Sequence, residues 1–202
     1  MAKKIKVLSS EDGYNLAAKE YDKNENYLNS FEQGELVPLL GSLAGKAVLD
    51  VGAGTGRLSL PMANRGAQVT AVDVSPKMLE LLKRKNNKII TQVGDAERLD
   101  FADETFDIVT ASFLIVHLKD PTRFFDEAYR VLKDGGILAV TNINQKTPPE
   151  VKTDSGLIII ESYYHRPEKV REIIESLAFQ IQEEVFIKEG ELWVNQIIIA
   201  KK

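Results

Sequence analysis

The sequence predicts an α/β fold built on a mostly parallel β-sheet, and two observations support this prediction. From about residue 46 to residue 178, short runs rich in Val, Ile and Leu alternate with segments whose apolar residues recur at helical spacing. Such alternation is typical of βαβ units, whose strands lie parallel. Beyond it, two long β-rich runs at 180–188 and 191–200 flank Glu189-Gly190, which predicts an antiparallel hairpin at one edge of the sheet.

The first 40 residues predict helix. Apolar residues recur at roughly helical spacing from Tyr14 to about Leu40, with interruptions at residues 24–26 and at Gly34. We therefore expect two short helices joined by a turn ahead of the sheet.

The later segments give strand and helix signals in turn. We expect strands at 46–51, 68–73, 88–93, 106–112 and 137–143, with an extended segment at 157–161. We expect helices at 57–65, 75–86 and 167–178, and one that starts at Asp120-Pro121 and ends at Gly135-Gly136. The second of these helices carries the clearest start signal, with Ser75 at the cap and Pro76 at the first helical position.

Composition limits the classes of partner and cofactor. The chain has 26 basic and 30 acidic residues and a net charge of −4, so it offers no cationic excess for nucleic acid. It has no cysteine, which excludes disulfides and thiolate nucleophiles, and we expect no metal site. No segment has the length and apolar character of a membrane span. We expect a cytoplasmic protein without a membrane partner, and the oligomeric state stays open.

The most informative segment is Val48–Arg57, where a β-branched run leads into Gly52, Gly54 and Gly56 and then into helix-forming sequence. Glycines let a ligand approach the backbone, and the following helix offers unpaired N–H groups. Asp73 ends the next predicted strand, where a ribose-binding carboxylate belongs. The loop is one residue shorter than the dinucleotide fingerprint Gly-x-Gly-x-x-Gly. An adenosine-containing cofactor is predicted, and an NAD-dependent oxidoreductase remains an alternative.

In these motifs and their order, the chain resembles the class I S-adenosylmethionine-dependent methyltransferases, and most closely the group of ubiquinone and menaquinone biosynthesis enzymes. The resemblance rests on Val48–Gly56, Asp73, Gly94-Asp95-Ala96, Phe106–Val109, Leu132–Leu138 and the terminal hairpin. It implies a Rossmann-like three-layer sandwich with a seven-stranded sheet of order 3-2-1-4-5-7-6, in which the last strand runs antiparallel. It also implies a single domain over residues 1–202, with a helical lid at 1–43 and the core at 44–202.

The resemblance also implies the cofactor, S-adenosyl-L-methionine, with S-adenosyl-L-homocysteine as its product. Asp73 would accept hydrogen bonds from both ribose hydroxyls, and Asp95 with Ala96 would contact adenine. The implied cofactor-binding residues are Tyr21, Asp50, Gly52, Ala53, Gly54, Thr55, Gly56, Asp73, Val74, Met78, Asp95, Ala96, Ala111 and Ser112. Tyr21 belongs to the lid and would reach the carboxylate of the cofactor, while the lid excludes water.

Methyl transfer from a sulfonium depends on positioning and does not strictly require a catalytic side chain. The catalytic residues are therefore left open, with His117, His165 and Tyr164 as candidates for acid–base chemistry. Candidates for the substrate pocket are Tyr14, Phe113, His117, Asn142, Asn144, Tyr164 and His165. Ordinary helix-start, loop and turn roles remain open for the histidines and asparagines.

The leading hypothesis is therefore a methyltransferase that acts on a small molecule, with protein methylation as a variant. A cofactor-binding regulatory module without turnover is a further alternative. Where base-modifying and glutamine-modifying enzymes carry Asn/Asp-Pro-Pro-Tyr/Phe, this chain has Ser112-Phe-Leu-Ile115, which argues against nucleic acid as the substrate. The methyl acceptor is not predicted.

Overall fold

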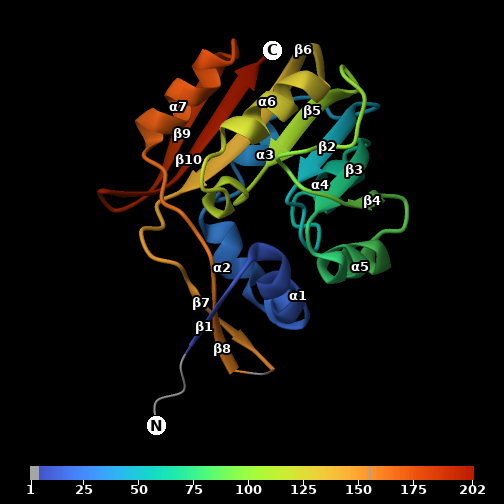
Figure 1. Ribbon diagram of the computed structural model, residues 1–202. Helices are drawn as coiled ribbons and strands as arrows, with labels where there is room; N and C mark the ends of the chain where they lie inside the picture. Colours follow the sequence, from blue (N-terminus) through green and yellow to red (C-terminus); the bar gives the residue numbers. More distant parts are fainter. Residues whose placement is uncertain (1–4, 155) are drawn as a thin grey trace.

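A computed structural model describes residues 5–154 and 156–202, so the first four residues of the predicted lid lie outside the described part. A seven-stranded sheet forms the centre of the molecule, in the order β4-β3-β2-β5-β6-β10-β9 (Figure 1). Its strands are β2 (Ala47–Val51), β3 (Gln68–Asp73), β4 (Ile90–Val93), β5 (Phe106–Ala111), β6 (Leu132–Ile143), β9 (Gln180–Glu189) and β10 (Leu192–Lys201). β10 runs antiparallel to both of its neighbours, whereas β2 to β6 are parallel. The predicted fold class and strand order are thus confirmed.

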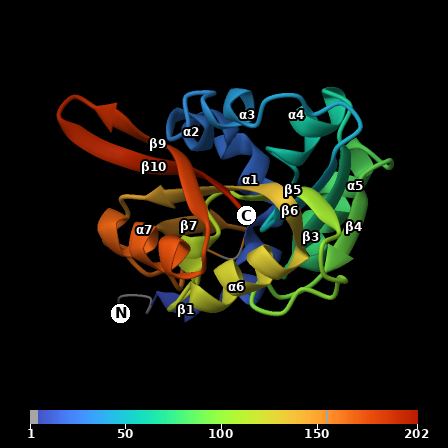
Figure 2. The same ribbon diagram turned by 90° about the horizontal axis from the view of Figure 1, so that it is seen from above.

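Helices cover both faces of this sheet and complete three layers (Figure 2). On one face, α3 (Leu36–Leu39), α4 (Ser59–Asn64) and α5 (Pro76–Lys85) share an apolar core with β2. On the other, α6 (Thr122–Val131) and α7 (Pro167–Ser176) pack their apolar sides over β5 and β6. Phe124 and Phe125 of α6 are fully buried there. Each face of the parallel sheet therefore has its own core, as its continuous apolar strands require.

A second, smaller sheet was not predicted. It has the order β1-β8-β7, from β1 (Lys6–Leu8), β7 (Glu150–Thr153) and β8 (Gly156–Ile160), and only the extended character of 157–161 was expected. β1 pairs in parallel with β8, about 150 residues away along the chain. Figure 1 shows the small sheet below the large one, near α1 (Ser10–Tyr21).

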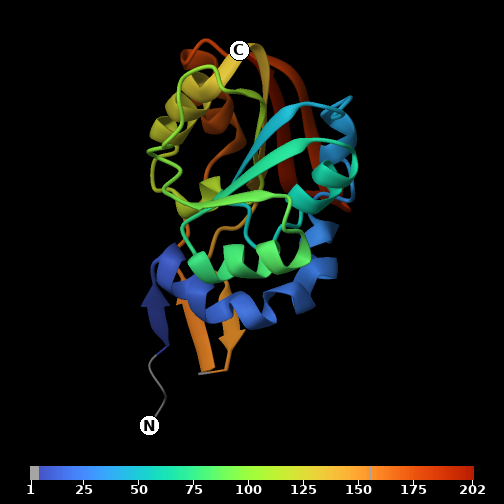
Figure 3. The same cartoon turned by 90° about the vertical axis from the view of Figure 1, so that its right-hand side faces the viewer.

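The N-terminal helices lie across one end of the large sheet. α1 is followed by the 3₁₀ turn η1 (Asp22–Asn24) and by α2 (Glu25–Ser30), close to the predicted pair of helices. Figure 3 shows α1 alongside α5, and Asn15 Oδ1 accepts a hydrogen bond of 2.8 Å from Ser75 Oγ. On its other side, α1 packs Gly13 so closely on β8 that a Cβ atom there would lie 2.6 Å from Ile160 Cγ1. α1 is therefore held between α5 and the small sheet.

One helix boundary differs from the prediction. α6 ends at Val131, and β6 starts at Leu132, before Gly135-Gly136. Gly135 has a φ of +74°, and the pairing of β5 with β6 shifts register in this region. The two glycines therefore mark an irregularity inside a strand, not the end of a helix.

The start of α5 agrees with the prediction, since Ser75 Oγ accepts from the Met78 backbone N–H at 3.3 Å. Within the described ranges, every helix is too short or too polar to cross a bilayer.

Candidate functional site

A cavity of about 560 Å³ lies between α1 and the carboxyl ends of the parallel strands β2, β3 and β5. The glycine loop after β2, the end of β3, the segment after β5 and α1 all contribute to its wall. The cavity therefore lies at the strand edge where open α/β sheets bind ligands.

The glycine loop is fixed by hydrogen bonds to β3. The backbone N–H groups of Gly52 and Ala53 donate to the carbonyl of Val72 at 2.8 and 3.0 Å. The Gly54 N–H donates to Asp73 Oδ2 at 2.8 Å. Gly52 and Gly54 have φ values of +72° and +55°, which favour glycine. The loop thus presents bare backbone to the cavity.

Asp73 is buried at the end of β3, with 8% of its surface exposed. Its Oδ1 accepts from the Ser75 N–H at 2.8 Å, and Oδ2 accepts from Gly54. Burial raises the pKa of Asp73, and the two backbone hydrogen bonds oppose that rise. Each oxygen retains acceptor capacity, so the carboxylate fits two neighbouring hydroxyls of a ligand.

A smaller hollow of about 310 Å³ adjoins the glycine loop and is lined by Tyr21, Asp50, Arg57 and Ser112, among others. Arg57 pairs with buried Glu32 at 2.6 Å, donates to Ser112 Oγ at 2.5 Å and lies 4.6 Å from the centre of the Phe113 ring. Ser112 in turn donates to Glu32. A compact polar network therefore joins the segment after α2 to the glycine loop.

Ten of the fourteen predicted cofactor residues line the cavity or this hollow. They are Tyr21, Asp50, Gly52, Ala53, Gly54, Asp73, Val74, Met78, Ala96 and Ser112. Their roles toward the cofactor stay predictions.

The other four predicted cofactor residues lie outside that lining. Thr55 Oγ1 donates to Asp22 at 2.5 Å, and Gly56 faces Leu82 of α5. Asp95 is exposed and accepts from the Glu97 N–H at 2.9 Å. Ala111 is fully buried in the core. Thr55, Gly56 and Ala111 thus serve the packing of the loop and strand ends, and Asp95 stabilises the turn after β4.

Of the predicted acceptor-pocket residues, Tyr14, Phe113 and His117 line the cavity. The Tyr14 hydroxyl lies 2.7 Å from His117 Nε2, and His117 Nδ1 lies 2.9 Å from the carbonyl oxygen of Glu161. The two rings meet edge to face, with centres 5.2 Å apart. The sequence predicted Tyr14 and His117 as separate candidates for the acceptor pocket, and the structure shows that their side chains are in contact.

The remaining acceptor candidates are placed elsewhere. His165 Nε2 lies 2.9 Å from the carbonyl oxygens of Ile115 and Leu118, so it bridges the end of the 3₁₀ turn η2 (Ile115–His117). Asn142 is buried and donates to Gln196 Oε1 at 2.9 Å. Both side chains use their polar atoms to join segments, which explains why they do not face the cavity.

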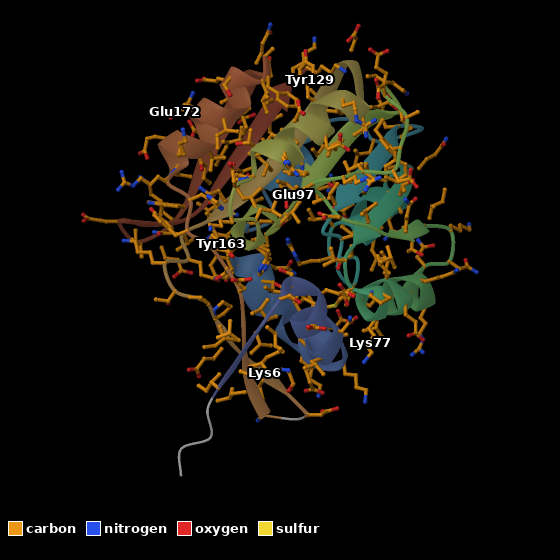
Figure 4. The ribbon with its side chains drawn as sticks, viewed as in Figure 1. Lys6, Lys77, Glu97, Tyr129, Tyr163 and Glu172 are labelled. Atoms are coloured by element: carbon orange, nitrogen blue, oxygen red, sulfur yellow. The ribbon has the colours of Figure 1, made fainter. Side chains whose placement is uncertain are left out.

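Asn144 and Tyr164 also lie outside the cavity lining. Asn144 donates to the Trp193 carbonyl at 2.8 Å, and the partly exposed Tyr164 lies under Lys146. The neighbouring Tyr163, labelled in Figure 4, donates its backbone N–H to the Val116 carbonyl at 2.7 Å. The segment before α7 is therefore fixed against η2, and its side chains do not line the cavity.

The comparisons with known proteins agree with this geometry. The sequence model of a family described as a methyltransferase domain matches residues 49–140. A demethylmenaquinone methyltransferase of Renibacterium salmoninarum is 42% identical over 112 residues, which are 55% of this chain and 47% of that protein. The enzyme of the same name from Tropheryma whipplei is 35% identical over 133 residues, 63% of this chain and 56% of that protein.

Residues 49–140 are thus similar in sequence to methyltransferase domains. The chain spans about half the length of the curated relatives that it matches. Among solved structures, a methyltransferase of Mesorhizobium loti gives a TM-score of 0.72 at 16% identity, covering 85% of this chain and 97% of that one. Magnesium protoporphyrin IX methyltransferase of Synechocystis with bound SAH gives a TM-score of 0.73 at 19% identity. That match covers 95% of this chain and 97% of the other. These two likenesses support the methyltransferase fold.

Sequence reasoning missed two residues of this site, Arg57 and Glu32. Arg57 directly follows the glycine motif, so its place beside the loop was available as a signal. Glu32 lies 25 residues earlier, in a segment that gave only a weak helical pattern. Within residues 5–154 and 156–202, no group of three or more His, Asp or Glu side chains is arranged to hold a metal ion.

Asp50 gives the site a pH-dependent element. Its carboxylate is buried at the end of β2 and accepts from Ser59 Oγ at 2.5 Å and Thr110 Oγ1 at 2.8 Å. Burial disfavours the charged form and raises the pKa of Asp50 to about 6, although these hydrogen bonds oppose the rise. The folded protein therefore binds this proton more tightly than the unfolded chain does.

A stability measurement tests this assignment. Protonated Asp50 contributes fully to the stability of the folded protein at pH values below the pKa that Asp50 has in the unfolded chain. This contribution is lost as the pH rises through about 6, the pKa of Asp50 in the folded protein. Relative to Asp50→Asn, the free energy of unfolding of the wild-type protein should fall by about 1.4 kcal/mol between pH 5 and pH 8. Urea unfolding at both pH values measures this difference, with the exposed Asp126→Asn as the control for an Asp-to-Asn substitution at the surface. A difference that stays constant with pH would contradict the assignment.

Proposed function

We propose that the protein transfers the methyl group of S-adenosyl-L-methionine to a small-molecule acceptor. The observation that carries the proposal is the arrangement of Asp73, the glycine loop and α1 around one cavity at the carboxyl ends of β2, β3 and β5. Bound there, the cofactor supplies an electrophilic methyl group on sulfur. The protein positions the two reactants, shields them from water and provides the electrostatic environment of the reaction.

The residues present fit this cofactor. The buried Asp73 has acceptor capacity for a vicinal diol, and the apolar side chains of Val74 and Met78 form a surface for a flat base. At the other end, Tyr21 and Arg57 offer donors beside the glycine loop, where an amino-acid carboxylate would lie. A Cβ atom at Gly52 would lie 3.1 Å from Leu114 Cδ1, so a side chain there would crowd the cavity wall.

The N-terminal segment would act as the lid. Asp22 accepts from Thr55 Oγ1 and pairs with Lys85 at 2.8 Å, which ties the end of α1 to the glycine loop and α5. Glu32 adds the contact with Arg57. These bonds hold α1 against the cavity, so closure would exclude water from a reactive methyl donor.

Cofactor affinity tests the proposal through Asp73. Replacing Asp73 with Asn removes a charged acceptor and should weaken S-adenosylhomocysteine binding by about 100-fold, because hydrogen bonds to charged groups contribute about 1.5–3 kcal/mol. Calorimetric titration measures the change, with the exposed Asp126→Asn as a folded control. An analogue without the ribose hydroxyls should bind the wild-type protein and Asp73→Asn equally weakly. Unchanged affinity for S-adenosylhomocysteine in Asp73→Asn would contradict the proposal that Asp73 binds the cofactor.

A small, partly apolar acceptor fits the site better than a protein. Phe113, Leu114 and Val51 line the cavity, and α1 and the segment after β5 enclose it. The relatives from Renibacterium salmoninarum and Tropheryma whipplei are named demethylmenaquinone methyltransferases, so their names refer to a molecule other than a protein. These relatives lend no support to the oxidoreductase alternative. Turnover of a basic peptide in place of any small molecule would favour the protein-methylation variant.

A further inference from the structure

Tyr14 and His117 form a hydrogen-bonded pair inside the cavity, although they come from opposite parts of the fold. Tyr14 lies on α1, and His117 ends η2 after β5. Their polar atoms are 2.7 Å apart, and both side chains line the cavity. The nearest ring to Tyr14 on α1 is that of Tyr21, with centres 5.8 Å apart. A titratable pair thus lies where the acceptor would enter.

The protein fixes the direction of both protons in this pair. His117 Nδ1 faces the carbonyl oxygen of Glu161, which can only accept, so Nδ1 carries the proton. His117 Nε2 is then an acceptor, and the Tyr14 hydroxyl must donate to it. The carbonyl is itself held in place, because the Glu161 N–H donates to the Leu8 carbonyl of β1 at 2.9 Å. The small sheet therefore sets the tautomer of His117.

The remaining titratable groups of the cavity lining are Tyr21 and Asp73. Both oxygens of Asp73 already accept from backbone N–H groups of the loop and the α5 start. The Tyr14 oxygen keeps lone pairs that no described residue uses. Burial raises the pKa of Tyr14, with Tyr21 and Asp73 adding to the rise, and burial lowers the pKa of His117. Both members of the pair are thus neutral before reaction.

We propose that Tyr14 and His117 form a proton relay that activates an acceptor with a weakly acidic hydroxyl group, such as a phenol. The inference rests on the proposed function and names its acceptor class. The acceptor hydroxyl gives its proton to Tyr14 Oη while the Tyr14 proton moves to His117 Nε2. The acceptor oxygen forms the bond to the methyl carbon, the carbon–sulfur bond breaks, and its electron pair stays on sulfur. The imidazolium then returns the proton through Tyr14 to solvent.

This step conserves charge inside the cavity. The positive charge on sulfur disappears as a positive charge appears on His117, so no net charge is created in a region of low dielectric constant. The Glu161 carbonyl accepts from Nδ1 throughout and stabilises the imidazolium. Because Tyr14 belongs to α1, the relay exists only when α1 is docked. Acceptor activation would therefore be coupled to closure of the site.

A kinetic experiment tests the relay with two acceptors of defined chemistry. One is 1-naphthol, whose hydroxyl is protonated at about pH 8, and the other is thiophenol, which is largely ionised there and needs no base. The variants are Tyr14→Phe, His117→Gln and the double variant, with Tyr129→Phe on α6, outside the cavity lining, as the matched control. Formation of S-adenosylhomocysteine and of methylated product is measured for each pair.

We expect naphthol turnover to fall by about 100-fold or more in either single variant, which is the usual contribution of general acid–base catalysis. The double variant should be no slower than the slower single variant, because the two residues act as one unit. Thiophenol turnover and the affinity for S-adenosylhomocysteine should stay within about threefold of wild type. Equal losses with both acceptors, additive losses, or no loss with naphthol would each overturn the relay.

A second measurement tests the relay even if the wild-type protein methylates neither acceptor. The chain has only two histidines, so ¹⁵N spectra of histidine-labelled protein with bound S-adenosylhomocysteine give two rings, and His165→Gln assigns them. The relay requires neutral His117 with its proton on Nδ1 at pH 7, and a changed Nε2 signal in Tyr14→Phe. A proton on Nε2, or a doubly protonated ring, would overturn it. Failure of the cofactor to bind at all would instead count against the proposed function.

Discussion

Replacing Gly56 with alanine should destabilise the protein by about 4 kcal/mol, because overpacking costs about 1–3 kcal/mol and a left-handed backbone about 1–2 kcal/mol. Gly56 has a φ of +95°, and a Cβ atom there would lie 2.2 Å from Leu82 Cδ1 and 3.4 Å from Leu60 Cγ. Leu82 is fully buried on α5, so its side chain cannot move aside without displacing its neighbours. Urea unfolding followed by circular dichroism measures the loss.

A matched variant separates the two causes. Gly45 has a φ of +74°, yet nothing lies within 4 Å of where its Cβ would be. Gly45→Ala should therefore cost only about 1–2 kcal/mol, the backbone part alone. If both variants lost the same stability, the contact with Leu82 would play no part and the packing role of Gly56 would be wrong.

The glycine loop shows what a local pattern can predict. The strand, the three glycines and Asp73 follow one another within 26 residues, and adjacent parallel strands bring their ends together. That proximity made the position of the loop and of Asp73 predictable. The pattern could not distinguish Gly52 and Gly54, which face the cavity, from Gly56, which faces α5. The distinction depends on where α5 packs, and a strand–helix motif does not contain that information.

Longer-range contacts explain the other differences between prediction and structure. β1 is only three residues long and pairs with β8, so neither strand alone carries a signal that specifies its partner. The two histidines looked equivalent in sequence, since each lies beside a short helical segment. Only the fold shows that His117 meets Tyr14 whereas His165 binds backbone carbonyls. Such pairings arise from packing between distant segments, and no local propensity encodes them.

Replacing Arg57 with methionine should cost about 3–5 kcal/mol of stability, since it leaves a buried carboxylate without its partner. The Arg57 and Glu32 side chains are only 11% and 4% exposed and are 2.6 Å apart. The double variant Arg57→Met with Glu32→Met removes both charges and should recover most of the loss. Urea unfolding of the four proteins gives the coupling energy directly.

The exposed pair Arg84–Glu80 supplies the control, with side chains 69% and 60% exposed. Arg84→Met should cost no more than about 1 kcal/mol, as expected for a solvated ion pair. If Arg57→Met cost as little, the buried pair would not hold the segment after α2 to the glycine loop. Arg57→Met should also change the pH dependence of stability in a definite direction, because the charge of Arg57 lowers the pKa of Asp50. Loss of Arg57 should move the pH-dependent fall in stability from about pH 6 to higher pH, which links the Arg57–Glu32 contact to the buried acid at the end of β2.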